Sequence, residues 1–220
     1  MMHPEQLQFI ELALARGALR FGRFKLKSGR ESPYFFNAGL FSDGEAAAVL
    51  GRCYAAALIR SGLAFDMLFG PAYKGIPLVT ATAIALAEQH GQRVPYAYNR
   101  KEAKAHGEGG TLVGAALAGR VVIVDDVISD GAAKREAIER IRATGAVPVG
   151  VLLALDRQER GESECSAAQE MQNRYGVRCV SIVTLDELIE ALARHAQSGT
   201  SISVEQLTSL ASYRDRYGAR

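Results

Sequence analysis

Short apolar segments and segments of helical spacing alternate along residues 65–195. Residues 121–124 are four consecutive β-branched residues, a pattern typical of a strand buried on both faces of a parallel sheet. The other strands predicted here lie at 65–69, 95–99, 148–155 and 177–183, and the helices at 78–89, 134–141, 167–175 and 185–195. This alternation predicts the α/β fold class, with one parallel sheet flanked by helices on both faces.

The N-terminal part of the chain has a different pattern. A helix is predicted for residues 4–18, where apolar residues recur at helical spacing after a proline. Residues 21–27 alternate between apolar and polar side chains, a turn follows, and 34–36 form a second short strand. We expect this hairpin to lie as a small hood over the carboxyl ends of the sheet strands. Because successive strand residues point to opposite faces, only one of Phe35 and Phe36 needs to pack in the core. The alternative, which these residues alone favour, is that both phenylalanines pack and Lys27 is solvated.

Two more helices complete the predicted organisation. One begins near residues 42–45 and ends at Arg60, and the last covers 204–217. The chain of 220 residues is long enough for one large α/β domain, and it contains no convincing linker. We interpret residues 1–220 as a single domain, with the hood at about 1–40, the core at about 41–195 and a C-terminal helix at about 201–217.

Composition narrows the classes of function. The 26 Lys and Arg residues nearly balance the 24 Asp and Glu residues, so no overall basic field favours nucleic acid as a partner. No run of 18 apolar residues occurs and the N-terminus lacks the apolar region of a signal peptide, so we expect neither a membrane span nor export. The three widely spaced cysteines match neither a disulfide framework nor a zinc site, which favours a reducing cytoplasm.

The strand at 121–124 is followed directly by two carboxylates, Asp125 and Asp126, then by a turn of small residues and a helix. Ligands of open α/β sheets bind where strands end in this way. The N–H groups of the turn and the helix dipole suit a phosphate, and paired carboxylates suit hydroxyl groups or Mg²⁺. The pattern therefore predicts a sugar-phosphate site. The alternative is an ordinary turn in which one acid caps the helix; the segment matches neither the GxxxxGK[ST] nor the GxGxxG motif.

Two other segments carry candidate cations. The loop at 70–77 joins a buried strand to a helix, contains two glycines, and has Lys74 near its tip, which fits either a second anion site or a structural loop. The segment 100–110 has almost no apolar residue to bury and is predicted to be a mobile surface loop. With three cations and His106 beside two anion sites it fits a closing lid, although a solvated charge run is the simpler alternative.

Arg157 follows the strand predicted at 148–155. Its guanidinium is suited to a bidentate contact with a carboxylate ligand. The alternative is that it pairs with its neighbour Asp156.

Together these segments resemble the type I phosphoribosyltransferases, and among them the bacterial orotate phosphoribosyltransferases. The resemblance covers nearly the whole chain and rests on residues 26–30 with 32–37, 69–77, 99–109, 124–129 and 155–160. The acidic motif around Asp125 alone would indicate only the larger family. The lid and hood segments are specific to the orotate enzymes.

The resemblance implies transfer of a phosphoribosyl group from 5-phosphoribosyl-1-pyrophosphate (PRPP) to orotate, in pyrimidine biosynthesis in the cytoplasm. It implies a type I phosphoribosyltransferase fold, a homodimer whose lid residues are shared across subunits, and Mg²⁺ carried mainly by the substrate near Asp125 and Asp126. No nucleic acid or membrane is implied as a partner. The catalytic residues would be Lys104, Asp125, Asp126, Lys74 and His106. Orotate would be bound by Lys27, Phe35, Phe36, Ser129 and Arg157. PRPP would be bound by Lys27, Tyr73, Lys74, Arg100, Lys101, Lys104, His106, Asp125, Asp126, Val127, Ile128, Ser129, Asp130, Gly131, Ala132 and Ala133.

One departure from the family pattern affects the phosphate turn. The family usually has Ala-Gly-Thr where this chain has Asp130-Gly131-Ala132. Ala132 lacks a hydroxyl group, and Asp130 adds a carboxylate next to a dianion, so we expect weaker affinity for PRPP. Two rival functions remain: a phosphoribosyltransferase for another base, and a regulator that senses PRPP without catalysis. Lys27, Phe35, Phe36 and Arg157 together favour orotate over the other bases.

Overall fold

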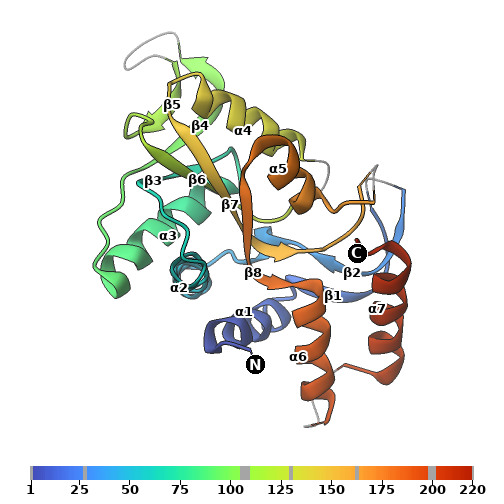
Figure 1. Ribbon diagram of the computed structural model, residues 1–220. Helices are drawn as coiled ribbons and strands as arrows, with labels where there is room; N and C mark the ends of the chain where they lie inside the picture. The colour runs from blue at the N-terminus through green and yellow to red at the C-terminus, as the bar shows by residue number, and fades with distance from the viewer. Residues whose placement is uncertain are drawn as a thin grey trace.

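The computed structural model describes residues 2–26, 29–104, 110–128, 131–161, 164–197 and 202–219. A six-stranded sheet with the order β5-β4-β3-β6-β7-β8 forms the centre of the molecule (Figure 1). Its neighbouring strands run parallel except for the antiparallel pair β4 and β5. The strands are β3 (Met67–Gly70), β4 (Tyr96–Lys104), β5 (Gly110–Gly114), β6 (Arg120–Asp125), β7 (Val147–Asp156) and β8 (Arg178–Thr184). The predicted α/β fold with a mostly parallel sheet is confirmed.

Helices cover both faces of this sheet. They are α1 (Pro4–Ala15), α2 (Gly44–Arg60), α3 (Gly75–His90), α4 (Ala132–Arg142), α5 (Ala167–Tyr175), α6 (Leu185–Gln197) and α7 (Val204–Tyr217), with a short 3-10 helix at Ala38–Leu40. Val122 and Val124 of β6 pack with residues of α1, α2 and α3, whereas Val121 and Ile123 pack with residues of α4 and α5. All four valine and isoleucine side chains are buried, which explains the continuous apolar run. In the described residues, no helix combines the length and the apolar character that crossing a bilayer requires.

Two helices begin earlier than the sequence predicts. Helix α3 begins at Gly75 instead of residue 78, and α4 begins at Ala132 instead of residue 134. Pro77 is therefore inside α3, but in its first turn, where the missing N–H has no intrahelical partner to lose. Gly131 precedes α4 in the left-handed conformation, with φ of 72°.

The prediction of a loop at 100–110 is wrong for the described residues of that segment. Residues 100–104 continue β4, and Gly110 begins β5, so that Lys104 is in register with Gly110. The main-chain hydrogen bonds of an antiparallel pair need no buried apolar side chain, which is why composition did not reveal these strands. The pair forms an arm at the edge of the sheet, in green in Figure 1.

The hood is an antiparallel hairpin of β1 (Leu19–Lys25) and β2 (Glu31–Phe36), covered by α7. Tyr34 of β2 meets Tyr213 of α7 edge to face, with 6.1 Å between ring centroids. The Arg157 guanidinium lies 4.3 Å from the centroid of the Tyr34 ring and donates to Ser32 Oγ at 3.2 Å. Because Arg157 directly follows β7, the hood lies at the carboxyl end of that strand, as predicted.

The turn between β3 and α3 depends on two glycines. A Cβ atom on Gly70 would lie 2.3 Å from the Gly75 carbonyl oxygen. A Cβ atom on Gly75 would lie 2.6 Å from Pro71 Cδ and 2.9 Å from the Val124 carbonyl oxygen. These glycines allow the start of α3 to approach the end of β6 directly.

We therefore expect Gly70→Ala to destabilise the protein by about 1–3 kcal/mol, because the added methyl group must displace the backbone of Gly75. Urea unfolding of the variant and the wild type measures the difference. Gly44→Ala is the matched control, since Gly44 begins α2 and a Cβ atom there would meet nothing within 4 Å. If Gly70→Ala unfolds at the same urea concentration as the control, the close approach does not limit this turn.

Candidate functional site

Two buried carboxylates at the end of β6 form the centre of the candidate site. Asp125 and Asp126 are each 7% exposed. Asp126 Oδ2 lies 2.6 Å from the Nζ atom of Lys74, which comes from the turn between β3 and α3. Asp125 Oδ2 lies 2.5 Å from the Nζ atom of Lys134, which comes from the first turn of α4. Each acid thus has its own cation, supplied by a different helix start.

Backbone contacts fix this strand end. The N–H of Asp126 donates to Asp125 Oδ1 at 2.9 Å, and the N–H of Val127 donates to Asp126 Oδ1 at 2.8 Å. The Tyr54 hydroxyl of α2 donates to the Asp125 carbonyl oxygen at 2.8 Å. Burial raises the pKa of Tyr54 well above its ordinary value, so the phenol keeps its proton for this bond.

The charge state of Asp125 reflects opposing effects. Burial raises the pKa of Asp125, and the neighbouring Asp126 carboxylate raises it further, while the Lys134 ammonium lowers it. The ion pair with Lys134 therefore offsets part of the rise in pKa that burial causes.

The turn between β3 and α3 brings further residues to this edge. The peptide bond between Ala72 and Tyr73 is cis. The N–H of Ala72 donates to Asn99 Oδ1 at 3.0 Å, which ties the turn to β4. Tyr73 is 65% exposed, and Lys101 of β4 places its Nζ atom 4.7 Å from the Tyr73 ring centroid. The Lys74 side chain is 51% exposed despite its ion pair, so it remains open to a ligand.

The predicted lid residues are described only in part. Arg100 and Lys101 belong to β4, where Arg100 is half-buried and Lys101 exposed. Lys104 is the last residue of that strand. Lys27, His106, Ser129 and Asp130, all predicted as site residues, lie outside the described residues.

The predicted phosphate turn leads into the N-terminus of α4. Gly131 precedes the helix, and Ala132 and Ala133 are its first two residues. Ile128 is buried in the core on the α4 side of the sheet, so its backbone and not its side chain faces a ligand. The N–H groups of the first helical turn have no intrahelical acceptors, which suits an anion here.

The two predicted hood phenylalanines point to opposite faces of β2. Phe36 is 8% exposed and packs in the core, 6.0 Å from Phe9 between ring centroids. Phe35 is half-buried on the other face and stacks on Phe24 at 5.5 Å. The alternation expected from sequence is confirmed.

Arg157 pairs with Glu159, at 2.6 Å between Nη2 and Oε1, and not with Asp156. Glu159 also accepts a hydrogen bond from the Tyr213 hydroxyl at 2.9 Å. Arg157 therefore lies under the hood in a network that includes α7, and 12% of its side chain is exposed.

Asp125 and Asp126 are also candidate ligands for Mg²⁺. Within the described ranges, His, Cys, Asp and Glu form no cluster of three or more that could hold a metal ion. Mg²⁺ is commonly bound by one or two carboxylates together with substrate phosphates and waters. Two carboxylates beside a helix N-terminus fit a metal that arrives with a polyphosphate, not one held by protein ligands alone.

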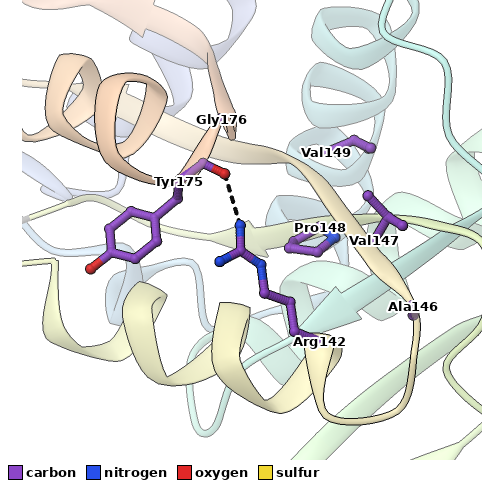
Figure 2. A pocket seen from close by; sticks show the side chains of 7 residues that line it. All are labelled: Arg142, Ala146, Val147, Pro148, Val149, Tyr175 and Gly176. Carbon is purple, nitrogen blue, oxygen red and sulfur yellow. Dashed lines mark hydrogen bonds between the residues drawn. The ribbon is translucent and has the colours of Figure 1, made fainter.

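A separate cavity of about 300 Å³ lies at the other end of β7, where that strand begins (Figure 2). In Figure 2, Arg142 donates to the Tyr175 carbonyl oxygen, at 2.9 Å. No carboxylate lines this cavity. Its lining residues are Arg142, Ala146, Val147, Pro148, Val149, Tyr175 and Gly176. Parallel strands bind ligands at their carboxyl ends, so the carboxylate site is the functional candidate.

Sequence reasoning missed Lys134. It was predicted only as the first residue of a helix, but it is 5% exposed and contacts a site carboxylate. The available signal was its spacing: it is buried together with Ala137, Ile138 and Ile141 along one face of α4.

Comparisons with known proteins agree with the fold and identify the family. The family model of the phosphoribosyl transferase domain matches residues 41–183. Over 217 residues the chain is 58% identical to orotate phosphoribosyltransferase of Klebsiella pneumoniae and 57% identical to that of Escherichia coli, in both cases over 99% of this chain and 100% of the relative.

A solved structure agrees as well. The crystal structure of orotate phosphoribosyltransferase from Francisella tularensis has a TM-score of 0.83 to this chain at 38% identity, covering 96% of this chain and 98% of that one. Whole-length identity and shared fold lead to one conclusion: the chain belongs to the orotate phosphoribosyltransferases, within the phosphoribosyltransferase family.

Proposed function

We propose that this protein transfers the phosphoribosyl group of PRPP to N1 of orotate, giving orotidine 5′-monophosphate and pyrophosphate in pyrimidine biosynthesis. The observation that carries the proposal is the paired-carboxylate site at the end of β6, in a chain that is 58% identical over its whole length to an orotate phosphoribosyltransferase. The sugar-phosphate site predicted from residues, the hood and the lid arm all fit these two substrates.

The carboxylates suit the ribose of the donor. Asp125 and Asp126 would accept hydrogen bonds from the ribose hydroxyls. As pyrophosphate leaves, positive charge builds up on the ribose ring, and nearby negative charge stabilises that transition state. Their burial makes this electrostatic effect stronger than it would be in water.

The cations suit the leaving group. Lys74 lies at the start of α3 with half of its side chain exposed, and Arg100, Lys101 and Lys104 lie along β4. These groups, with His106, would stabilise the negative charge that develops on pyrophosphate. When bound with the donor, Mg²⁺ would supply further positive charge at the same oxygens.

The 5′-phosphate would bind at the N-terminus of α4. Gly131, Ala132 and Ala133 offer backbone N–H groups, and the helix dipole favours an anion there. The preceding residues of the turn, Val127 to Asp130, would complete this cradle.

Orotate would bind under the hood. Arg157 is suited to the carboxylate of orotate, and Lys27, Phe35 and Ser129 would complete the pocket. The side chain of Phe36 is buried in the core, so its contribution would come through the shape of β2 and not through an exposed ring. A base without a carboxylate would offer Arg157 no such contact.

We further propose a cytoplasmic homodimer in which each lid reaches the neighbouring active site. The antiparallel arm of β4 and β5 supports this, because it lies at an edge of the sheet and carries the cations Arg100, Lys101 and Lys104. A lid closed over the site would exclude the water that otherwise hydrolyses the donor.

An absorbance assay tests the main proposal. Incubating the protein with orotate, PRPP and Mg²⁺ should lower the orotate absorbance, and omitting PRPP should abolish the change. Uracil, adenine and hypoxanthine in place of orotate should give no product. Consumption of one of these bases instead would favour the rival transferase, and binding of PRPP with no consumption of any base would favour the regulator.

Lys74→Met should lower kcat by roughly 10²–10³, the typical loss when one preorganised group that stabilises a transition-state charge is removed. Steady-state kinetics with saturating PRPP and orotate measures the change. Arg93→Met is the control, because Arg93 is an exposed cation in the connection between α3 and β4. A kcat for Lys74→Met equal to that of the control would remove Lys74 from the mechanism.

Ala132→Thr should lower the KM for PRPP by about tenfold, since it restores a hydroxyl that can donate a hydrogen bond to the charged phosphate. Ala132→Val is the matched control: it has the same shape as Thr but no hydroxyl. If Thr and Val give the same KM, the missing hydroxyl is not what weakens donor binding.

A further inference from the structure

Lys134 occupies a position where two local effects oppose a lysine. It belongs to the buried face of α4, where an apolar side chain would pack without desolvating a charge. It also lies in the first turn of the helix, where the positive end of the macrodipole disfavours a cation. A lysine that is 5% exposed at such a position needs a specific partner.

The Lys134 ammonium has two partners. It contacts Asp125 Oδ2 at 2.5 Å and donates to the Val127 carbonyl oxygen at 2.6 Å. Asp125 is the last residue of β6, Val127 begins the phosphate turn, and Lys134 belongs to the helix after it. One ammonium group thus joins the strand end, the turn and the helix, and closes the turn at its base.

We propose that Lys134 is a positioning residue for the donor site: it holds the Asp125 carboxylate toward the ribose hydroxyls and fixes the turn that receives the 5′-phosphate. The inference rests on the proposed function. Lys74 contacts Asp126, so among the described residues Lys134 is the cation in contact with Asp125. The Asp126 N–H donates to Asp125 Oδ1, and the Tyr54 hydroxyl donates to the main-chain carbonyl oxygen of Asp125. Neither of these groups can replace an ammonium at Oδ2.

If Lys134 positions donor-binding groups, its loss should affect PRPP more than orotate. If it only balances charge in the fold, its loss should affect both substrates alike. Loss of Lys134 releases the Asp125 carboxylate and the base of the turn, both of which face the donor. Among the described residues, the part of the orotate pocket formed by β2 and Arg157 makes no contact with Lys134, whereas Ser129 belongs to the turn itself. Donor binding should therefore weaken more than orotate binding.

The test compares Lys134→Met, which has similar length without charge, with Lys134→Arg, which keeps the charge. Lys134→Met should lower kcat/KM for PRPP by about 10²-fold, the cost of a small misplacement of reacting groups, and change the KM for orotate by a much smaller factor. Lys134→Arg should recover most of the loss. Arg142→Met is the control, because it removes a cation from the last turn of the same helix, at the cavity of Figure 2.

Lys134→Met leaves a buried carboxylate without its partner and can fail to fold, so a second comparison is needed. Asp125→Asn combined with Lys134→Met removes both charges. Because the ion pair with Asp125 no longer exists in the Asp125→Asn background, adding Lys134→Met there should lower kcat/KM for PRPP by a smaller factor than it does in the wild type. The factor that remains measures the contact with the Val127 carbonyl oxygen. Melting curves and circular dichroism confirm that each variant is folded.

Three outcomes would overturn the inference: an unchanged kcat/KM for PRPP in Lys134→Met, equal losses for PRPP and orotate, or a loss from Lys134→Met that is as large in the Asp125→Asn background as in the wild type. Failure of the proposed function looks different, because the wild type itself would then consume no orotate. In that case calorimetric titration of PRPP into the wild type and Lys134→Met still tests whether Lys134 supports donor binding.

Discussion

Two carboxylates buried side by side at the end of β6 impose the main constraint on this structure. Adjacent negative charges repel each other, and each buried charge costs several kcal/mol unless it is paired. The fold meets this constraint with two lysines, Lys74 on Asp126 and Lys134 on Asp125, and with backbone N–H groups that donate to the remaining carboxylate oxygens. A helix start is needed on each side of the strand end to bring both cations there.

The sheet order makes this possible. Because β3 lies next to β6 and runs parallel to it, the turn after β3 lies beside the end of β6. Gly70 and Gly75 bring that turn to van der Waals distance of the Val124 backbone, which places Lys74 within reach of Asp126. The helix after β6 supplies the other cation from the opposite face of the sheet. The site is thus a consequence of parallel strand order and two close backbone approaches.

Local patterns in the sequence predicted the parts of this site that depend on local structure. The apolar run before Asp125 and Asp126 identified the strand end, and the glycine-containing strand–helix turn identified the place from which Lys74 reaches the same edge of the sheet. Contacts between distant segments were not predictable in the same way. The β4–β5 arm is held by main-chain hydrogen bonds, which side-chain composition does not reveal. The partner of Arg157 could be assigned only from the structure, which places Glu159 beside it. The burial of Lys134 was not predicted, because a lysine is buried only where it has a partner, and its partner Asp125 lies at the strand end.

The two ion pairs differ in how exposed their lysines are. The Lys134 side chain is 7% exposed and also holds the Val127 carbonyl oxygen, so it cannot leave Asp125 without opening the turn. The Lys74 side chain is 51% exposed, so it can move without opening the fold, but the Asp126 side chain is 9% exposed and needs a replacement partner when Lys74 leaves. Under the proposed function, Lys74 would turn from Asp126 to an incoming pyrophosphate while a ribose hydroxyl replaces it on that carboxylate. One lysine would then fix the site, and the other would respond to the substrate.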